Sequence, residues 1–414
     1  MSVIRNLQGM EILDSRGRPT VLARCELESG AHATASVPSG ASRGSSEAFE
    51  LRDGDPCRYR GLGCRQAAAN IGEVLYRRLK GRAFEDQEQL DHELTTADGT
   101  PNLKRIGANA ILSVSIAFAR AQAAERGVPL YSYFASLAGA VVRQMPVLMI
   151  NLFSGGKHAG KQVAIQDVLI VPVTAQTIDA ALVQGAEVYQ CAAELCLERY
   201  GMRMLVADEG GLAPPFESVR AMLDLAMDAI RRAGLHPGRE IALAVDVASS
   251  HFFERGFYHL DDRCLTSEEM IAVIAEWARA YPILSVEDGL AEGEWCYWPA
   301  LRSALTPRTI TLGDDLLCTN PALITRAIES HACDALLLKV NQIGTLTGAL
   351  HALRLARGAG WKVVISVRSG ETEDDWAADL VTGWQGDFFK NGSLTRSERL
   401  AKYNRLLRIE QETS

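Results

Sequence analysis

Hydrophobic and polar residues alternate along the first forty positions of the chain, as they do in β-strands that are buried on one side. The pattern predicts three strands, over residues 3–13, 20–27 and 31–37. A helix is predicted over residues 109–126, because hydrophobic side chains such as Ile111 and Phe118 fall on one face. Gly127, with a proline two residues later, ends this helix.

After residue 139 the pattern changes to short hydrophobic runs that alternate with helical segments. The runs cover residues 241–245, 283–286, 309–312, 335–338 and 363–366. Such alternation is typical of a βα barrel or of a doubly wound sheet. A chain of 414 residues is long for one domain, so we expect two, with a boundary near residues 139–146.

Each of these hydrophobic runs is followed, directly or after one residue, by charged or polar residues. They are Asp246, Glu287 with Asp288, Asp314 with Asp315, Lys339, and Arg368 with Ser369. In a barrel the C-terminal ends of the strands face one mouth, where active sites lie. The spacing therefore predicts that these side chains share a single pocket.

The acidic residues in this set are candidate ligands of a hard divalent cation. Asp246, Glu287 and Asp314 offer only carboxylate oxygens, which Mg²⁺ prefers, and no neighbouring His or Cys suggests zinc. The alternative is that each acid caps the helix after its strand. Lys339 follows a very hydrophobic run, where burial and a nearby Arg368 would lower its pKa toward that of a general base. The alternative is a lysine that reaches the rim of the barrel.

The composition of the chain argues against nucleic-acid and membrane partners. The net charge of −8 argues against nonspecific binding of nucleic acid. No hydrophobic run is long enough to cross a bilayer, and the first fourteen residues do not resemble a signal peptide. The nine cysteines include no Cys-x-x-Cys pair, which indicates reduced thiols. We expect a cytoplasmic protein without nucleic-acid or membrane partners.

Two glycine-rich segments are candidate ligand loops. Residues 39–44 contain small side chains that would let a loop close over a ligand. Residues 155–161 approach the start of a phosphate loop, but Gln162 stands where Mg²⁺ coordination needs Ser or Thr. We interpret the second match as a coincidence.

Longer motifs resemble those of the enolase family, in the same order and over almost the whole chain. They are residues 14–20 (DSRGRPT), 37–42 (VPSGAS), 207–211 (ADEGG), 246–250 (DVASS), 285–288 (SVED), 313–316 (GDDL), 336–344 (LLLKVNQIG), 368–374 (RSGETED) and 396–402 (RSERLAK). The resemblance implies an α/β fold class, with an α+β lid domain over residues 1–138. An enolase-type modified (β/α)8 barrel over residues 139–414 would follow and carry the catalytic site.

The resemblance also implies roles for individual residues and two Mg²⁺ ions per active site, of which the second arrives with the substrate. The metal ligands would be Asp246, Glu287 and Asp314, with Ser39 at the second ion. Lys339 would remove the proton next to the substrate carboxylate, and Glu209 would act as general acid. The other catalytic residues would be Asp167, beside Glu209, and His158, on a closing loop. The substrate, a small phosphorylated or phosphono acid, would contact Ser39, Gln166, Arg368, Ser369 and Lys390.

Two positions at the leaving-group end of this site depart from the family pattern. Val367 stands where ordinary enolases have a histidine, and Asp167 stands where they have a glutamate. A missing proton donor typically costs a factor of roughly 10² to 10⁴ in rate. The residues for proton abstraction are all present, so the change is concentrated in the second half of the reaction.

We therefore predict a magnesium-dependent enzyme that forms an enolate from 2-phosphoglycerate or a close phospho or phosphono analogue. The first hypothesis is similarity to carboxyphosphonoenolpyruvate synthases of phosphonate biosynthesis. The alternatives are an ordinary enolase, which converts 2-phosphoglycerate to phosphoenolpyruvate, and a catalytically inactive enolase-like binding protein. A homodimer is expected, because Arg16 lies where the family makes an intersubunit ion pair and Gln411, beside Glu410, lies at the position of its partner.

Overall fold

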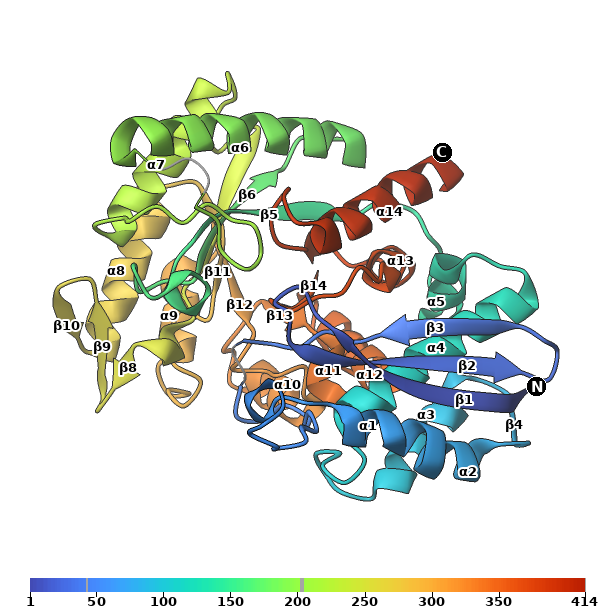
Figure 1. Ribbon diagram of the computed structural model, residues 1–414. Helices are drawn as coiled ribbons and strands as arrows, with labels where there is room; N and C mark the ends of the chain where they lie inside the picture. The colour runs from blue at the N-terminus through green and yellow to red at the C-terminus, as the bar shows by residue number, and fades with distance from the viewer. Residues whose placement is uncertain (42–43, 202–204, 414) are drawn as a thin grey trace.

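The computed structural model describes residues 1–41, 44–201 and 205–413. An antiparallel sheet and its helices form the N-terminal part, and a closed barrel surrounded by helices forms the rest. Figure 1 shows the N-terminal sheet, in blue, beside the later elements of the barrel, in orange and red. Helix α4 (Ala108–Arg126) packs against this sheet and also against helices of the barrel.

The N-terminal sheet has the strand order β3-β2-β1-β4. Its strands are β1 (Ser2–Leu13), β2 (Pro19–Leu27), β3 (His32–Ser36) and β4 (Ala83–Phe84). On β2 the hydrophobic side chains of Val21, Ala23 and Cys25 are buried, while Arg24 between them is exposed. This alternation is what places one face of the sheet against α4.

Short helices precede and follow α4. They are η1 (Tyr59–Gly61), α1 (Arg65–Asn70), η2 (Ile71–Leu75), α2 (Tyr76–Leu79), α3 (Gln87–Asp98) and α5 (Leu130–Ala138). Helix α4 ends as predicted, at Gly127 in the left-handed conformation with φ of 64°. It is buried on nearly all sides, because it lies between the sheet and the barrel helices α11 (Val340–Ile343) and α12 (Leu346–Gly358).

The barrel closes in the order β11-β12-β13-β14-β15-β5-β6-β7. Its strands are β5 (Val147–Ser154), β6 (Asp167–Pro172), β7 (Ile241–Asp246), β11 (Ile283–Glu287), β12 (Ile310–Gly313), β13 (Ala335–Leu338), β14 (Lys362–Ser366) and β15 (Phe388–Lys390). Strand β6 runs antiparallel to both of its neighbours, and the other neighbouring strands are parallel. The fold is thus the modified eight-stranded barrel that the enolase resemblance implies, and the doubly wound alternative is wrong.

The remaining elements surround the barrel. The helices are α6 (Ile178–Tyr200), α7 (Val219–Arg232), α8 (Ser267–Ala280), α9 (Trp298–Leu305), α10 (Pro321–Glu329), α13 (Trp376–Gly383) and α14 (Ser397–Thr413), with the short turns η3 (Gly156–Ala159) and η4 (Ser249–His251). A separate small sheet contains β8 (Phe253–Glu254), β9 (Phe257–Leu260) and β10 (Arg263–Leu265). The start of α8 is fixed by a capping box between Thr266 and Glu269.

Side chains fill the barrel interior below the mouth. Leu337 of β13 belongs to this inner cluster, whereas Leu336 and Leu338 pack outward against the helices. The inner cluster consists of Met149, Leu169, Val171, Ala242, Ala244, Leu312, Ala335, Leu337 and Val364. The hydrophobic filling leaves the C-terminal ends of the strands as the place for polar chemistry.

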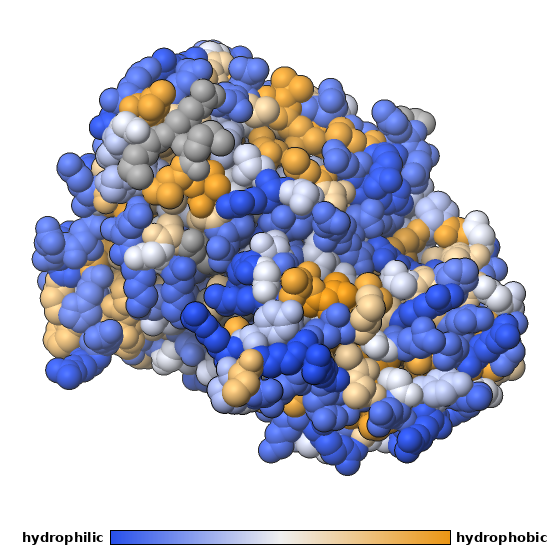
Figure 2. All heavy atoms as spheres, viewed as in Figure 1, coloured by the Kyte–Doolittle hydropathy of each residue, from blue (hydrophilic) through white to orange (hydrophobic). Residues whose placement is uncertain are grey.

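The cysteines, the helices and the surface each bear on the expectations from composition. All nine cysteines are free thiols. Among the described residues, no helix has both the length and the hydrophobicity to cross a membrane. Figure 2 shows hydrophobic side chains in separate groups among hydrophilic ones on the face that it draws, which is ordinary for a protein surface.

Candidate active site

The ends of the parallel strands bring the predicted charged side chains to one mouth of the barrel. Asp246 and Glu287 are the last residues of β7 and β11, and they stand opposite each other in the strand register. Asp314 and Lys339 directly follow β12 and β13. All four side chains are buried. The structure therefore groups these residues as their spacing predicts.

Lysine ammonium groups lie against the three carboxylates. Lys390 Nζ is 2.8 Å from Asp246 Oδ2 and 2.7 Å from Glu287 Oε2. Lys339 Nζ forms an ion pair with Asp314 Oδ2. Each carboxylate is thus partly neutralised by a buried lysine, and each lysine is held by a carboxylate.

The ion pair changes the expected titration of Lys339. Burial lowers the pKa of Lys339, the Asp314 carboxylate raises it, and Arg368 lowers it. The resulting pKa lies above the ordinary lysine value, so the prediction of a lowered pKa is wrong for this ion-paired state. The sequence did not reveal that Asp314 is the direct partner of the lysine, and the carboxylates of Asp314 and Glu287 act together against burial.

Glu287 has an environment that suits a divalent cation. Burial and the Asp246 carboxylate raise the pKa of Glu287 well above its usual range, although Lys390 acts against them. Glu287 Oε1 is buried, and no hydrogen-bond partner is found for it within the described part of the chain. Charged oxygens that are buried and incompletely hydrogen-bonded fit a hard metal ion. Glu287 therefore has the chemistry of a ligand for a hard metal ion such as Mg²⁺.

Asp288 organises the neighbouring acidic residues, a role that the sequence analysis did not assign. Its two carboxylate oxygens accept the backbone N–H groups of Asp314, at 2.9 Å, and Asp315, at 2.7 Å. Oxygen atoms of these three residues all lie within 4.8 Å of one another. Burial and the Asp314 carboxylate raise the pKa of Asp315 to about 7. The Glu287–Asp288 pair at the end of β11 was the available signal, but it did not show which acid faces the backbone.

Arg368, a predicted phosphate ligand, is held by a residue from the N-terminal domain. Its guanidinium forms a two-pronged ion pair with Glu47, at 3.0 and 3.2 Å. It also donates to Asn341 Oδ1 at 3.1 Å. The sequence analysis did not single out Glu47, because its partner lies 321 positions along the chain.

Ser369 and Ser39 meet where the two domains touch. The backbone groups of Ser39 and Gly370 exchange hydrogen bonds, at 2.8 and 3.0 Å. Ser369 Oγ accepts N–H groups from Arg16, at 3.1 Å, and from Ala41, at 2.8 Å. Among the described residues no acceptor is found for the Ser369 hydroxyl proton, which a ligand could therefore accept. The Ser39 hydroxyl donates to Glu50 at 3.2 Å and accepts from Arg52 at 2.8 Å.

Arg16 has a different partner from the one expected in a dimer. Its guanidinium pairs with Asp14 at 3.0 Å and donates to the Ser39 carbonyl at 2.9 Å. Only 6% of its side chain is exposed, so it is committed within the subunit. Glu410 caps helix α6 by accepting the N–H of Ile178 at 2.6 Å, and Gln411 is exposed. These contacts give no support to the expected intersubunit ion pair through Arg16.

The residues expected at the leaving-group end of the site differ in whether they line the cavity. Glu209 lines the cavity, and so does Gln166, whose amide nitrogen donates to Asp246 Oδ2 at 3.0 Å. Asp167 is fully buried, and its Oδ1 accepts hydrogen bonds from Asn151 and Ser154, both at 2.8 Å. Asp167 is therefore placed behind the cavity wall, where it anchors β5 to β6.

Two further residues named in the sequence analysis are Val367 and His158. Val367 lines the cavity and makes this part of its wall apolar. The backbone of His158 belongs to η3, but its side chain lies outside what the structure describes.

The cavity at the barrel mouth is small in this conformation. Its volume is about 20 Å³, and it is lined by Gln166, Glu209, Lys339, Ser366, Val367, Arg368, Ser369 and Lys390. A space of this size holds roughly one water molecule. This cavity is therefore smaller than a phosphorylated three-carbon acid.

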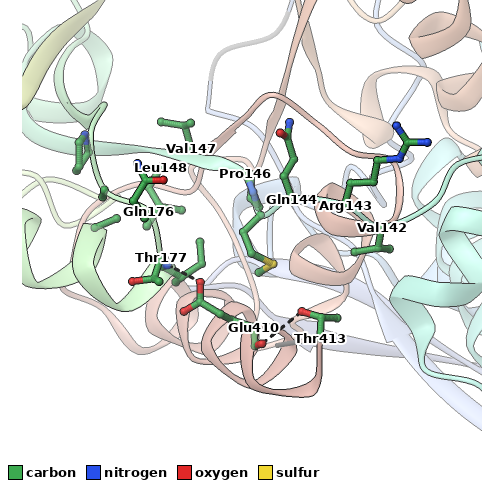
Figure 3. A pocket seen from close by; sticks show the side chains of 15 residues that line it. Val142, Arg143, Gln144, Pro146, Val147, Leu148, Gln176, Thr177, Glu410 and Thr413 are labelled. Atoms are coloured by element: carbon green, nitrogen blue, oxygen red, sulfur yellow. Dashed lines mark hydrogen bonds between the residues drawn. The ribbon is translucent and has the colours of Figure 1, made fainter.

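A larger cavity, of about 470 Å³, lies at the opposite end of the barrel. It is lined by the segment before β5, the start of α6 and the end of α14 (Figure 3). Val147, in its wall, pairs with the first residue of β15, whereas Lys390 is the last residue of that strand. Glu410, its acidic residue, is engaged in capping α6. The chemistry of the site is therefore concentrated in the smaller cavity.

Comparison with known families agrees with this geometry. Residues 4–134 match the family model described as Enolase, N-terminal domain. Residues 142–414 match the model described as Enolase, C-terminal TIM barrel domain. The matches follow each other in chain order and together cover nearly the whole sequence. The chain therefore belongs to the enolase family of magnesium-dependent carbon–oxygen lyases.

Proposed function

We propose that this enzyme forms an enolate from 2-phosphoglycerate or from a close phospho or phosphono analogue. The observation that carries the proposal is the pairing of Lys339 and Lys390 with buried carboxylates at the wall of one small cavity. The same cavity contains Arg368, Ser369 and Glu209. These groups are of the kinds needed to remove a proton from a small acid, to stabilise the negative charge that forms and to bind a phosphate.

Asp246, Glu287 and Asp314 would hold a first Mg²⁺, and Ser39 would contribute at a second. When bound, Mg²⁺ supplies positive charge that stabilises the enolate formed next to the substrate carboxylate. A Lys or His base used together with one or two Mg²⁺ ions is the general arrangement of enolase-superfamily sites. The oxygen-only donor set supports this assignment, as does Glu287 Oε1, which has no hydrogen-bond partner among the described residues.

Lys339 would accept the proton from C2 of the substrate. In its ion pair with Asp314 the lysine keeps its proton, because the carboxylate raises its pKa. Once Asp314 serves a metal ion, burial and the positive charge of Arg368 favour the neutral amine. Lys390 would then remain as the ammonium group that faces the developing negative charge.

We propose that this protein differs from ordinary enolases in the second step of the reaction, in which the 3-hydroxyl group leaves. Val367 offers no proton at the cavity wall, and Asp167 is engaged with Asn151 and Ser154. Loss of the 3-hydroxyl needs a proton donor, and Glu209 is the remaining acid in the cavity. These features favour similarity to carboxyphosphonoenolpyruvate synthases, enolase relatives that act on a phosphonoformate-derived substrate.

The test is to incubate the protein with Mg²⁺ and 2-phosphoglycerate in D₂O. The C2 proton is followed by NMR, while phosphoenolpyruvate is followed by absorbance. Exchange of the C2 proton with little phosphoenolpyruvate supports the proposal and calls for an activated phosphonoformate as second substrate. Phosphoenolpyruvate at an ordinary enolase rate identifies the protein as a simple enolase.

Two lysine variants make the result specific. Lys339→Met should abolish C2 exchange, because the base is lost. Lys362→Met is the control, since Lys362 is exposed and pairs with Asp387 at the far end of β14. Absence of exchange in the unmodified protein, together with absence of Mg²⁺ binding by calorimetry, would favour an inactive enolase-like binding protein.

We also propose that the protein is a cytoplasmic homodimer, as the family resemblance implies. Light scattering tests the assembly, and a mass near that of one 45.0 kDa chain would contradict it.

A further inference from the structure

Gln342, three residues after Lys339, is almost completely buried although it lies beside the proposed site. It is 1% exposed and belongs to the short helix α11. Its side-chain nitrogen donates to Asp314 Oδ1 at 2.9 Å and to Glu47 Oε1 at 3.4 Å. One amide group thus contacts a proposed metal ligand and a residue of the N-terminal domain.

The orientation of this amide follows from its third contact. Thr319 Oγ1 accepts the backbone N–H of Lys339 at 2.9 Å. Its only proton is therefore free to be donated, and Gln342 Oε1 lies 2.7 Å away. The amide oxygen must face Thr319, which directs both N–H bonds toward the two carboxylates. A flipped amide would place its oxygen against two negative charges.

Glu47 extends the connection to the proposed phosphate site. Its carboxylate pairs with Arg368, and the same side chain accepts the N–H of Gly44 at 3.1 Å. The backbone N–H of Ala48 donates to the Gln342 carbonyl at 2.8 Å. A buried series of polar contacts therefore runs from Arg368 through Glu47 and Gln342 to Asp314.

We propose that Gln342 is a positioning residue that fixes the Asp314 carboxylate and couples it to the segment of residues 44–48. This segment is called the lid segment below. Gln342 touches neither substrate nor reacting atoms, and it acts through Asp314 and Glu47. Docking of the lid segment and orientation of the Asp314 carboxylate then stabilise each other, because the Gln342 amide donates hydrogen bonds to both Asp314 and Glu47.

The inference about Asp314 rests on the proposed metal site, whereas the inference about the lid segment does not. Residues that orient a metal ligand from behind typically change metal affinity by about 10- to 100-fold when removed. Gln342→Met keeps the shape of the side chain and removes all three hydrogen bonds. The Kd for Mg²⁺ should rise by about this factor.

The experiment measures Mg²⁺ binding by calorimetry on the full chain without substrate. Hydrogen exchange of the lid segment is measured on the same protein without metal. Gln87→Met is the matched control, because Gln87 is also buried and donates to a carboxylate, Asp91, at 3.0 Å in the N-terminal domain. Gln342→Met should weaken Mg²⁺ binding and speed exchange in the lid segment, and Gln87→Met should do neither.

A second pair of variants tests the orientation of the Gln342 amide through Thr319, whose hydroxyl also accepts the backbone N–H of Lys339. Thr319→Val removes the hydroxyl group that orients the amide, and Thr319→Ser keeps it. Thr319→Val should shift both measurements in the direction of Gln342→Met, and Thr319→Ser should stay near the unmodified protein. This pair decides the matter if Gln342→Met fails to fold.

The outcomes separate this inference from the proposed function. Equal Mg²⁺ affinity and equal lid exchange in Gln342→Met and Gln87→Met would overturn the inference. If the unmodified protein binds no Mg²⁺, the proposed metal site fails. Lid exchange then decides the coupling alone, and unchanged exchange in Gln342→Met would overturn it.

Discussion

The ammonium nitrogen of Lys390 lies 2.7 Å from Glu287 Oε2 and so stands beside a carboxylate that the proposed metal site needs. The same nitrogen lies 2.8 Å from Asp246. A protein cation therefore stabilises these buried acids when no metal is bound, because two neighbouring carboxylates repel each other in a site of low dielectric constant. The stability of the protein should therefore depend on whether the Lys390 ammonium group or a metal ion faces Asp246 and Glu287.

Replacement of Lys390 tests this dependence. Lys390→Met should lower the melting temperature without metal, since Asp246 and Glu287 lose their partner. Added Mg²⁺ should then raise the melting temperature more in the variant than in the unmodified protein. The control is Lys402→Met, because Lys402 is equally buried but pairs with Glu371. An equal Mg²⁺ effect in all three proteins would count against a metal at these carboxylates.

Mg²⁺ binding should release protons near neutral pH. Burial raises the pKa of Glu287, and burial with Asp314 raises that of Asp315 to about 7. Protons are therefore retained in the metal-free site at pH values where free carboxyl groups are ionised. Metal ions bind the ionised form, so affinity should rise with pH through about 7 and fall as pH decreases. Calorimetry in buffers with different ionisation enthalpies measures the release, and a pH-independent affinity would contradict it.

The contact between Gly44 and Cys318 predicts a steric requirement for lid docking. A Cβ atom at Gly44 would lie 2.3 Å from Cys318 Sγ. Gly44→Ala should therefore displace the lid segment and raise KM, with little change in the melting temperature of the barrel. Adding Cys318→Ala should recover part of the loss, since the new methyl group would still lie 3.3 Å from the Asp315 carbonyl. Substrate kinetics test this, and an unchanged KM in Gly44→Ala would show that docking tolerates the methyl group.

Val367 provides a test of the proposed specialisation. Val367→His restores an imidazole to the cavity wall, and proton donors of this kind typically contribute about 10²- to 10⁴-fold in rate. Phosphoenolpyruvate formation from 2-phosphoglycerate should increase relative to C2 exchange. Val367→Leu is the control, because it changes the size of the side chain without adding a donor. A ratio that stays the same in both variants would mean that this position does not limit the second step.

Local patterns in the sequence predicted much of the fold. Alternation along residues 20–27 predicted a strand that became β2, and the polar residue after each hydrophobic run predicted the charged mouth. Strand β15, with three residues, and the antiparallel β6 were not predicted. Three residues are too few to show a period, and strand direction has no local signal.

The sequence by itself determined the family, the barrel and the set of residues at its mouth, because these depend on short-range periodicity and on motifs in a fixed order. Only the tertiary structure decided which charges meet. Asp314 raises the pKa of Lys339 against the effect of burial, and Glu47 reaches Arg368 from the other domain. These contacts join positions 25 and 321 residues apart, so they exist only once the barrel has closed and the N-terminal domain has docked on it. The physical reason is that an ionisable group responds to its nearest charges in space, which the order of residues along the chain does not specify.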